Sequence, residues 1–474
     1  MIATVARQFD IVVVGGGLVG AAAAGLFAGD GFEVAVVERG DGSGGGGDGA
    51  GGAGDGTDDG ADGAGDGAGG AGDGADDGAD SRVSAINLAA AALFKHLGAW
   101  PGDATVCAYR AMKVWDRNSA AKIAFRAADL GRDRLGSIVE NRVLVAALRE
   151  KLRAHARVAW LDDTEITAID ARGAALRVEL SGETIDAQLL VGADGANSKV
   201  RELAGIATAR RDFGQDAITA TVAVAEHRHT AWQCFLDTGP AALLPLADGR
   251  CALVWSCARG LSDELMALPA EDFCARLQAG FAGGGGGGGQ FCDKFGGEYG
   301  RLSGEFGDKF DDQRGGETGG DFGSQLGAIT DCGSRRRFPL LQHHADSYLA
   351  ASAPVALIGD AAHAIHPLAG LGANIGLVDA AALAEVVSQA RARGAGPGKY
   401  GILRRYERWR RGENAAVVQF MAGFHDLFRS RAPAAKIARA AGFNCADRSP
   451  PLKAALAGCA TGLCGDLPKV CRGV

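Results

Sequence analysis

The sequence has no apolar run long enough to cross a membrane, and it contains few aromatic residues. Of its 474 residues, 47% are hydrophobic but only 6% are aromatic. No stretch of about 18 consecutive apolar residues occurs, so no spanning helix is expected. The first residues run directly into a strand pattern without the charged, apolar and small-residue order of a signal peptide. The apolar content excludes wholesale disorder, the length allows roughly two to three domains, and we expect a cytoplasmic protein.

The eleven cysteines form neither a Cys-x-x-Cys pair nor a pattern with histidine. A structural zinc site and a disulfide framework are therefore not indicated, and we expect reduced thiols and no metal. Cys459 and Cys464 are separated by four residues, a spacing found in flavin disulfide reductases. They lie at the C-terminus, far from the nucleotide motif described below, which favours a structural role over a redox role.

Two segments are too rich in glycine to form a core of their own. Residues 41–80 contain 19 Gly and 11 Asp with no Lys or Arg, and residues 283–333 contain a further 19 Gly. Such compositions cannot bury enough apolar surface to order themselves, so both are interpreted as low-complexity inserts. Without the first insert the formal net charge changes from -8 to +3, so the net negative charge of the chain comes from this insert and not from the rest of the protein.

The rest of the chain is well patterned. Residues 11–14, 21–28 and 33–37 predict a strand, a helix and a second strand, the first three elements of a nucleotide-binding fold. Further along, the pattern predicts helices at 82–97, 141–152 and 374–391 with helix continuing to about 442, and strands at 109–125 (a pair), 166–180 (a hairpin), 188–191, 217–225, 251–257 and 355–358.

The first strand and helix are joined by Gly15-x-Gly17-x-x-Gly20, and Glu38 ends the second strand. In such a turn the first glycine permits the tight bend, the second lets the backbone approach a pyrophosphate, and the third permits close helix packing. The helix start offers free N–H groups to the phosphates, and Glu38 is placed to accept hydrogen bonds from a ribose. The motif predicts dinucleotide binding but does not choose between FAD and NAD.

Two later segments carry polar residues at the ends of buried strands. Residues 189–201 run from Leu-Leu-Val into a turn that contains Asp194. Residues 356–376 place Asp360 at the end of a strand, where its carboxylate can accept hydrogen bonds from the hydroxyl groups of a polyol chain. The loop that follows leads into a helix whose first N–H groups stabilise negative charge on a ring.

In this order and spacing, the three segments resemble the FAD-dependent aromatic-ring hydroxylases of the para-hydroxybenzoate hydroxylase superfamily. Within it, residues 82–86, 140–142 and 359–379 are similar to the hydroxylases of ubiquinone biosynthesis. The resemblance implies the following FAD contacts: Gly15, Gly17, Gly20 and Glu38 at the ADP half; Arg82 and Arg142 along the cofactor; Gly359, Asp360 and Pro367 in the third motif, with Asp360 at the ribityl chain and pyrophosphate; and Gly370, Gly372, Ala373 and Asn374 at the pyrimidine edge of the flavin. Asp194 belongs to the motif linked to both FAD and NAD(P)H.

The resemblance implies an α/β fold with a Rossmann-type FAD-binding domain, an inserted, mostly antiparallel substrate sheet and a helical C-terminus. The predicted domains are 1–90, 135–207 and 340–400 for FAD, 91–134 and 208–339 for the substrate, and 401–474 for the C-terminal helices, with inserts at 41–80 and 283–333.

The implied reaction is hydroxylation of a polyprenylated phenol or quinol in ubiquinone biosynthesis, with NAD(P)H and O2 as co-substrates. The cofactor makes the new bond, so no catalytic side chain is assigned. A polyprenyl tail favours an enzyme at the surface of the inner membrane, with that surface or a biosynthetic complex as partner and no nucleic acid.

Alternatives to these assignments remain open. Leu371 stands where the family usually has Gln, which favours a non-catalytic flavoprotein as one alternative; a flavin oxidoreductase of the prenyl-reductase type is another. Asp360, His363 and His366 have metal-like spacing but lie in the flavin motif. The basic stretch 404–411, with Tyr406 and Trp409, is interpreted first as a solvated helix face with its rings turned inward, and next as a contact with an anionic membrane.

Overall fold

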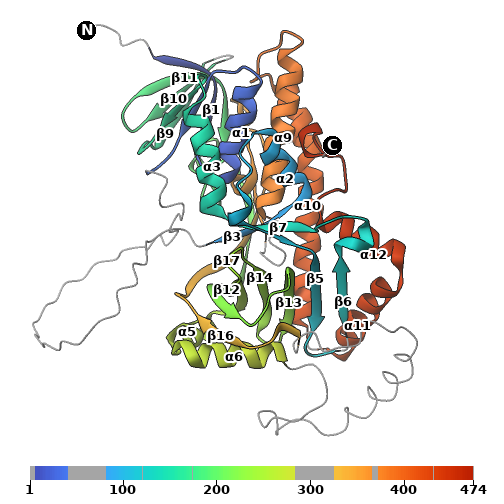
Figure 1. The fold of residues 1–474 in the computed structure, drawn as a ribbon. Coiled ribbons are helices and arrows are strands. Elements are labelled where there is room, and N and C mark those ends of the chain that lie inside the picture. The colour runs from blue at the N-terminus through green and yellow to red at the C-terminus, as the bar shows by residue number, and fades with distance from the viewer. Residues whose placement is uncertain are drawn as a thin grey trace, which may run out of the picture.

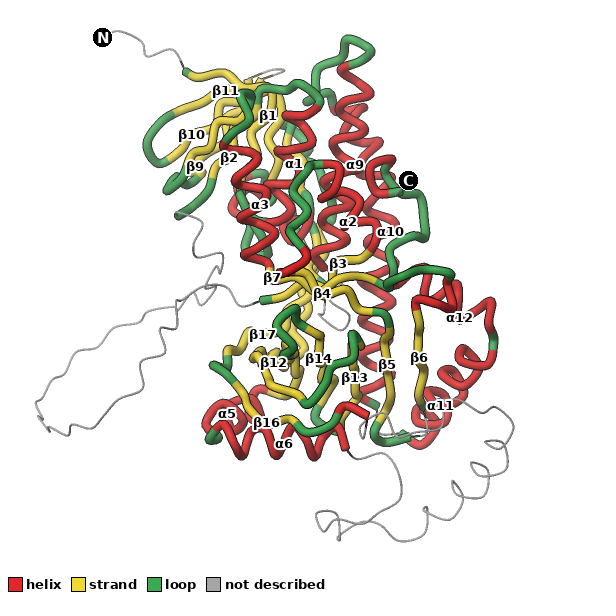
Figure 2. Tube along the Cα trace, viewed as in Figure 1, coloured by secondary structure: helices red, strands yellow, loops and turns green. Residues whose placement is uncertain are grey.

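The computed structural model describes residues 6–40, 82–119, 121–172, 175–282, 325–365, 372–430 and 432–472. The predicted insert at 41–80 lies outside these residues, as does most of the insert at 283–333. Two large sheets stand one above the other, with a small third sheet between them (Figure 1, Figure 2). Each sheet collects strands from distant parts of the chain.

The upper sheet has a parallel centre. Its strands run in the order β8, β2, β1, β11, β10 and β9, with β18 also paired to β11. Pairs among β8, β2, β1, β11 and β18 are parallel, and the β9–β10 hairpin is antiparallel. The bounds are β1 Arg7–Val14, β2 Val34–Val37, β8 Val158–Leu161, β9 Ile166–Arg172, β10 Ala175–Leu180, β11 Thr184–Gly192 and β18 Val355–Leu357. Residues 11–14 are buried, as a parallel strand covered on both faces requires.

Helices cover this sheet. α1 (Leu18–Gly29) packs against α3 (Asn141–Arg153) and α9 (Gly372–Arg391), and α9 packs against α2 (Leu88–His96) and α10 (Tyr400–Arg429). In α3 the buried residues are Leu144, Leu148 and Leu152, spaced four apart on one face, as its amphipathic pattern predicts. Shorter helices are α4 Lys199–Leu203, η1 Asp103–Thr105, η2 Ala127–Leu130, η3 Gly359–Ala361 and η4 Lys469–Cys471.

The lower sheet is almost wholly antiparallel. Its order is β19, β17, β12, β15, β14, β13, β5 and β6, with β16 also paired to β12; only the β5–β13 pair is parallel. The bounds are β5 Ala111–Asp116, β6 Lys122–Arg126, β12 Thr208–Val224, β13 Thr230–Leu236, β14 Gly239–Pro245, β15 Cys251–Ala258, β16 Ile329–Cys332, β17 Arg336–Ala345 and β19 His363–Ala364. Helices α5 (Arg259–Ala267) and α6 (Ala270–Ala282) lie beneath it (Figure 1). The α/β fold with an inserted antiparallel sheet and a helical C-terminus is confirmed.

The small middle sheet, in the order β3, β7 and β4, was not predicted from the sequence. Its strands are β3 Val83–Asn87, β7 Gly136–Glu140 and β4 Val106–Tyr109. The prediction of one helix over 82–97 is wrong for its first half, because residues 83–87 pair with β7. Helix α2 begins only after Asn87, whose Oδ1 accepts the Ala90 N–H at 2.9 Å.

The described C-terminal part consists mainly of three α-helices: α10 ends at Arg429, α11 spans Pro433–Arg448 and α12 spans Pro450–Ala460. The helix predicted to continue from 374 to about 442 is therefore broken twice, between Arg391 and Tyr400 and again between Arg429 and Pro433. Proline at the first position of α11 has no N–H to continue α10, which explains the second break. No described helix has both the length and the apolar character needed to span a membrane.

A disulfide joins Cys459, in the last turn of α12, to Cys464, which follows the helix. The expectation of reduced thiols throughout is therefore wrong for this pair. A five-residue separation brings the two Cα atoms to 5.0 Å at the end of a helix, within the range a disulfide requires. The eight free cysteines that the structure describes are buried except for Cys445.

Candidate functional site

Two glycines at the turn after β1, Gly15 and Gly20, could not be replaced by another residue without moving the backbone. Gly15 has a φ of +102°, and a Cβ on it would lie 2.4 Å from the Ala193 carbonyl oxygen. A Cβ on Gly20 would lie 1.9 Å from the Gly15 carbonyl oxygen. Both glycines therefore serve close backbone packing, as the sequence motif predicts.

Gly17 differs from its two neighbours in the motif. It caps the N-terminus of α1, and a Cβ on it would meet no atom within 4 Å. No side chain caps this helix start and no acidic residue lies in its first turn. The free N–H groups and the positive end of the helix dipole thus face open space, an arrangement that fits an anionic pyrophosphate.

Glu38 lies beside the same turn, at the end of β2. Its carboxylate accepts the Gly16 backbone N–H, and Trp160 packs against Gly16 on the same side. Burial raises the pKa of Glu38, although the Gly16 hydrogen bond opposes the shift. The carboxylate is thus held at the edge of the turn, and its contact with a ribose stays a prediction.

The second motif is tied to the first through its backbone. A Cβ on Gly15 would lie 2.9 Å from the Asp194 Cα. The Asp194 carboxylate accepts hydrogen bonds from Ser198 Oγ at 2.5 Å and from the Val200 N–H at 3.0 Å. Asp194 therefore shapes the turn before α4, and its predicted cofactor contact remains a prediction.

Arg201 connects the second motif to the third and was given no role in the sequence analysis. Its guanidinium is buried and donates to the carbonyl oxygens of Ala196 and Ala361, each at 2.8 Å. Nearby, His343 Nε2 donates to the Asp360 carbonyl oxygen at 2.8 Å. Burial, and then the Arg201 charge, lowers the pKa of His343 to about 4, so this imidazole is neutral at pH 7. Neither residue has a sequence signal, because each acts on backbone atoms of a distant segment.

The third motif packs against the start of α1. Gly359 has a φ of +57°, and a Cβ on it would lie 3.1 Å from a Val19 methyl group; a Cβ on Gly376 would lie 2.8 Å from the same side chain. The Asp360 side chain is exposed, yet desolvation by the surrounding protein raises its pKa, against the opposing charges of His363 and Arg82. The three motifs thus meet around the N-terminus of α1.

The start of α9 is fixed by Asn374. Its Oδ1 accepts the Asn87 N–H at 2.9 Å, and its Nδ2 donates to the Ala85 carbonyl oxygen at 2.8 Å. Gly372 and Ala373 precede it in the first turn, which holds no acidic residue. Asn374 therefore links α9 to β3 and leaves the helix start available to an anionic group.

Of the remaining predicted positions, Arg82 and Arg142 are among the described residues, and their predicted contacts with the cofactor stay predictions. The Arg142 guanidinium pairs with Glu140 at 2.5 Å on the surface at the start of α3, and Arg82 acts electrostatically on Asp360. Pro367, Gly370 and Leu371 lie outside the described residues, so their predicted roles stay predictions.

A buried ionic network lies directly behind the third motif. Asp379 is fully buried and accepts hydrogen bonds from Arg410 Nε at 2.8 Å and Asn414 Nδ2 at 2.9 Å, while His363 Nε2 lies 2.5 Å from its other oxygen. Burial opposes ionisation, but His363 and Arg410 outweigh it and lower the pKa of Asp379 to about 2. The network holds the strand end that carries Asp360.

This network corrects the expectation for the basic stretch 404–411. Its rings do turn inward, with Tyr406 fully buried, but Arg410 is buried rather than solvated because it pairs with Asp379. Helical spacing alone places Arg410 on the inner face beside Tyr406. A buried arginine requires a carboxylate partner, which only the fold supplies.

The contribution of the Tyr406 hydroxyl group to this packing can be tested by a single substitution. Its Oη donates to the Leu357 carbonyl oxygen at 2.8 Å, at the end of β18. Tyr406→Phe should lower the free energy of unfolding by about 1–2 kcal/mol, because the buried carbonyl loses its donor. Urea unfolding measures this difference. An unchanged midpoint would show that water replaces the hydroxyl group.

Comparison with known proteins agrees with this geometry. The family model described as "FAD binding domain" matches residues 130–273 and 327–421. The 3-demethoxyubiquinol 3-hydroxylase of Escherichia coli (strain K12) is 32% identical over 448 residues, covering 94% of this chain and 96% of that protein. The mitochondrial ubiquinone biosynthesis monooxygenase COQ6 of Danio rerio is 32% identical over 391 residues, covering 79% of this chain and 78% of that protein.

This chain belongs to the family of FAD-dependent hydroxylases of ubiquinone biosynthesis. It is a FAD-dependent monooxygenase, an enzyme class that uses NAD(P)H and O2. The resemblance inferred from the three motifs is confirmed.

Two solved structures share the fold of this chain. The probable FAD-dependent monooxygenase PqsL of Pseudomonas aeruginosa aligns with a TM-score of 0.67 at 21% identity, covering 92% of this chain and all of that one. The p-nitrophenol 4-monooxygenase PnpA of Pseudomonas putida DLL-E4 aligns with a TM-score of 0.66 at 17% identity, covering 98% of this chain and 99% of that one. These similarities support the fold.

Proposed function

We propose that this FAD-dependent hydroxylase adds a hydroxyl group to the aromatic ring of a polyprenylated phenol or quinol. The observation that carries the proposal is the match to the Escherichia coli hydroxylase over 94% of the chain, which includes both the FAD motifs and the substrate sheet. In the balanced reaction one oxygen atom of O2 replaces a ring hydrogen as hydroxyl. The other oxygen atom of O2 is reduced to water, and NAD(P)H supplies the two electrons.

The residues of the chain bind and orient; none is assigned as an acid or base. When bound, FAD supplies the redox chemistry, accepting hydride from NAD(P)H and activating O2. The start of α1 at Gly17 would hold the pyrophosphate, Glu38 the ribose and Asp360 the ribityl chain. The start of α9, held by Asn374, would stabilise negative charge on the flavin. Arg201 and Asp379 act as positioning residues, because they fix the backbone of these segments.

Labelled oxygen provides the test. Purified FAD-loaded enzyme, supplied with NADPH or NADH and a short-tailed polyprenyl phenol, should oxidise the nucleotide faster with the phenol present. It should place one ¹⁸O atom from ¹⁸O2 in the product, detected by mass spectrometry. Nucleotide oxidation without ¹⁸O in the product would instead indicate the reductase alternative. Bound FAD without stimulated oxidation would indicate a non-catalytic flavoprotein.

We further propose that the C-terminal helices contact the surface of the inner membrane. Large exposed apolar side chains concentrate there among the described residues: Phe420, Leu427, Ile437, Leu452 and Leu456, with exposed fractions from 37% to 70%. Apolar side chains on amphipathic helices bind the membrane interface, and basic neighbours such as Arg429 and Arg448 favour anionic lipid.

Vesicle flotation tests this surface. Replacing Phe420 and Ile437 with Ser should reduce binding to vesicles of anionic phospholipid by at least about tenfold, since each loses an apolar anchor. Leu341→Ser is the matched control, because Leu341 is half exposed but lies on β17. Equal binding by the double variant and the control would contradict the assignment.

A further inference from the structure

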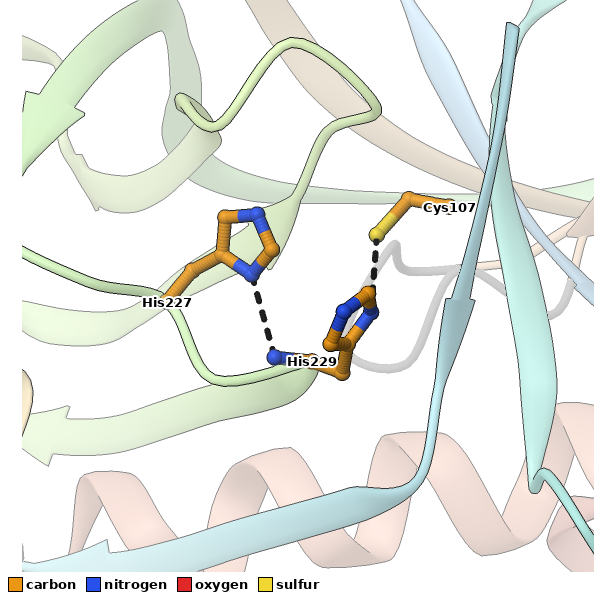
Figure 3. A group of neighbouring side chains, drawn as sticks. All are labelled: Cys107, His227 and His229. Atoms are coloured by element: carbon orange, nitrogen blue, oxygen red, sulfur yellow. Dashed lines mark hydrogen bonds between the residues drawn. The ribbon is translucent and has the colours of Figure 1, made fainter. Parts of the chain in front are cut away.

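A cysteine and two histidines meet at the junction of the small and the lower sheets, apart from the residues assigned to FAD. Cys107 lies on β4, and His227 and His229 lie in the connection between β12 and β13 (Figure 3). The sulfur and one ring nitrogen of each histidine all lie within 4.8 Å of one another. Cys107 Sγ is 3.8 Å from His229 Nδ1.

The backbone holds both imidazoles on one side of a tight turn. Arg228 and His229 have φ values of 50° and 49°, a left-handed conformation that residues other than glycine rarely adopt. The His229 N–H donates to His227 Nδ1 at 3.0 Å, and the His229 carbonyl oxygen accepts the Arg110 N–H at 2.7 Å. This costly backbone conformation is kept at the point where the two rings approach Cys107, as is common at binding sites.

We propose that Cys107, His227 and His229 bind one Zn²⁺ ion, with water as the fourth ligand. Thiolate and imidazole are the ligands that zinc prefers, at about 2.3 Å for sulfur and 2.0–2.1 Å for nitrogen. Tetrahedral bonds of these lengths separate the ligand atoms by roughly 3.3–3.6 Å, so side-chain movements of about 1 Å would close the site around the ion. His229 is exposed and Cys107 is buried, which leaves one side open for entry of the ion and water.

Asp248, whose carboxylate also pairs with Arg250 at 2.7 Å, acts electrostatically on the cluster. Burial, and then the negative charge of Asp248, raises the pKa of Cys107 to about 11, so the thiol is protonated without metal. The same carboxylate acts on His227.

The position of the cluster indicates a structural effect of the metal. β4 belongs to the small sheet, whereas β12 and β13 belong to the lower sheet. An ion held by residues from both would join the two sheets at one point. The sequence gives no sign of this site, because Cys107 lies 120 residues before His227 and only the fold brings them together.

Metal binding to the FAD-loaded enzyme, with any affinity tag removed, tests the proposal. Dialysis against micromolar free Zn²⁺ should leave one equivalent in the wild-type protein, and Zn²⁺ should raise its melting temperature. Co²⁺ in place of Zn²⁺ should give the visible bands of a tetrahedral site and a thiolate-to-metal charge-transfer band. Cys107→Ser, His227→Gln and His229→Gln should each weaken Zn²⁺ binding by at least about 100-fold, since even changes to partners of metal ligands cost 10–100-fold.

Two variants serve as controls. Cys445→Ser and His96→Gln remove an exposed cysteine and an exposed histidine away from the cluster and should leave binding unchanged. FAD content, measured in every variant, shows whether the protein is folded; His229→Gln is informative even if Cys107→Ser misfolds, because His229 is exposed. Wild-type protein that retains no Zn²⁺, or folded ligand variants that retain a full equivalent, would overturn the proposal.

Discussion

Gly17→Ala should weaken FAD binding strongly while leaving the apoprotein as stable as the wild type. A Cβ on Gly17 meets no protein atom within 4 Å, so the fold can accept it. That methyl group would occupy the space in which we place the pyrophosphate at the start of α1. We expect the dissociation constant for FAD to rise by at least about tenfold, which corresponds to about 1.4 kcal/mol. Titration followed by flavin fluorescence measures it.

Two other glycines of the same region provide the controls. Gly29, at the end of α1, also has no atom within 4 Å of a Cβ, and Gly29→Ala should leave FAD affinity unchanged. Gly15→Ala should instead destabilise the apoprotein, because φ is +102° and the Ala193 oxygen is 2.4 Å from the new Cβ. Wild-type FAD affinity in Gly17→Ala would mean that the pyrophosphate does not lie at this helix start.

Asp379→Asn should have the largest effect on stability. The substitution removes the buried carboxylate that pairs with the Arg410 guanidinium, which is only 4% exposed, and leaves it with Glu413, a partner nearer the surface. Breaking a buried ion pair costs about 3–5 kcal/mol, and we expect about 3 kcal/mol because Glu413 still compensates part of the charge. Urea unfolding should show this loss. Asp186→Asn is the matched control: its partner Arg177 lies 3.0 Å away but the pair is partly exposed, so less than about 1 kcal/mol is expected.

The same carboxylate predicts how stability depends on pH. The folded-state pKa of Asp379 is about 2, below its ordinary value of 3.8. A carboxyl group whose pKa is lower in the folded state stabilises the fold at pH values above its pKa in the unfolded state. This stabilisation is lost as the pH falls towards its pKa in the folded state. The difference between the two pKa values corresponds to about 2 kcal/mol of stability. Wild-type stability should therefore fall between pH 4 and pH 2 by that amount more than the stability of Asp379→Asn. Parallel pH profiles would contradict the assignment.

The sequence determined the local parts of the enzyme. Residues 11–38 predicted a strand, a glycine turn, a helix and a second strand, because periodicity and glycine spacing depend only on neighbouring residues. The hairpin at 166–180 and the helix at 141–152 followed for the same reason. The motifs were specific enough to indicate FAD and the hydroxylase family, which the comparisons confirmed.

The tertiary structure decided which residues support those motifs. Residues 83–87 form a strand because β7 pairs with them, and Arg410 is buried because Asp379 offers it a carboxylate. The contacts of Arg201 with Ala196 and Ala361 join segments about 160 residues apart in the chain. Hydrogen bonds and ion pairs of this kind depend on distances across the folded molecule. They leave no periodic trace in the sequence, so only the arrangement of the sheets and helices reveals them.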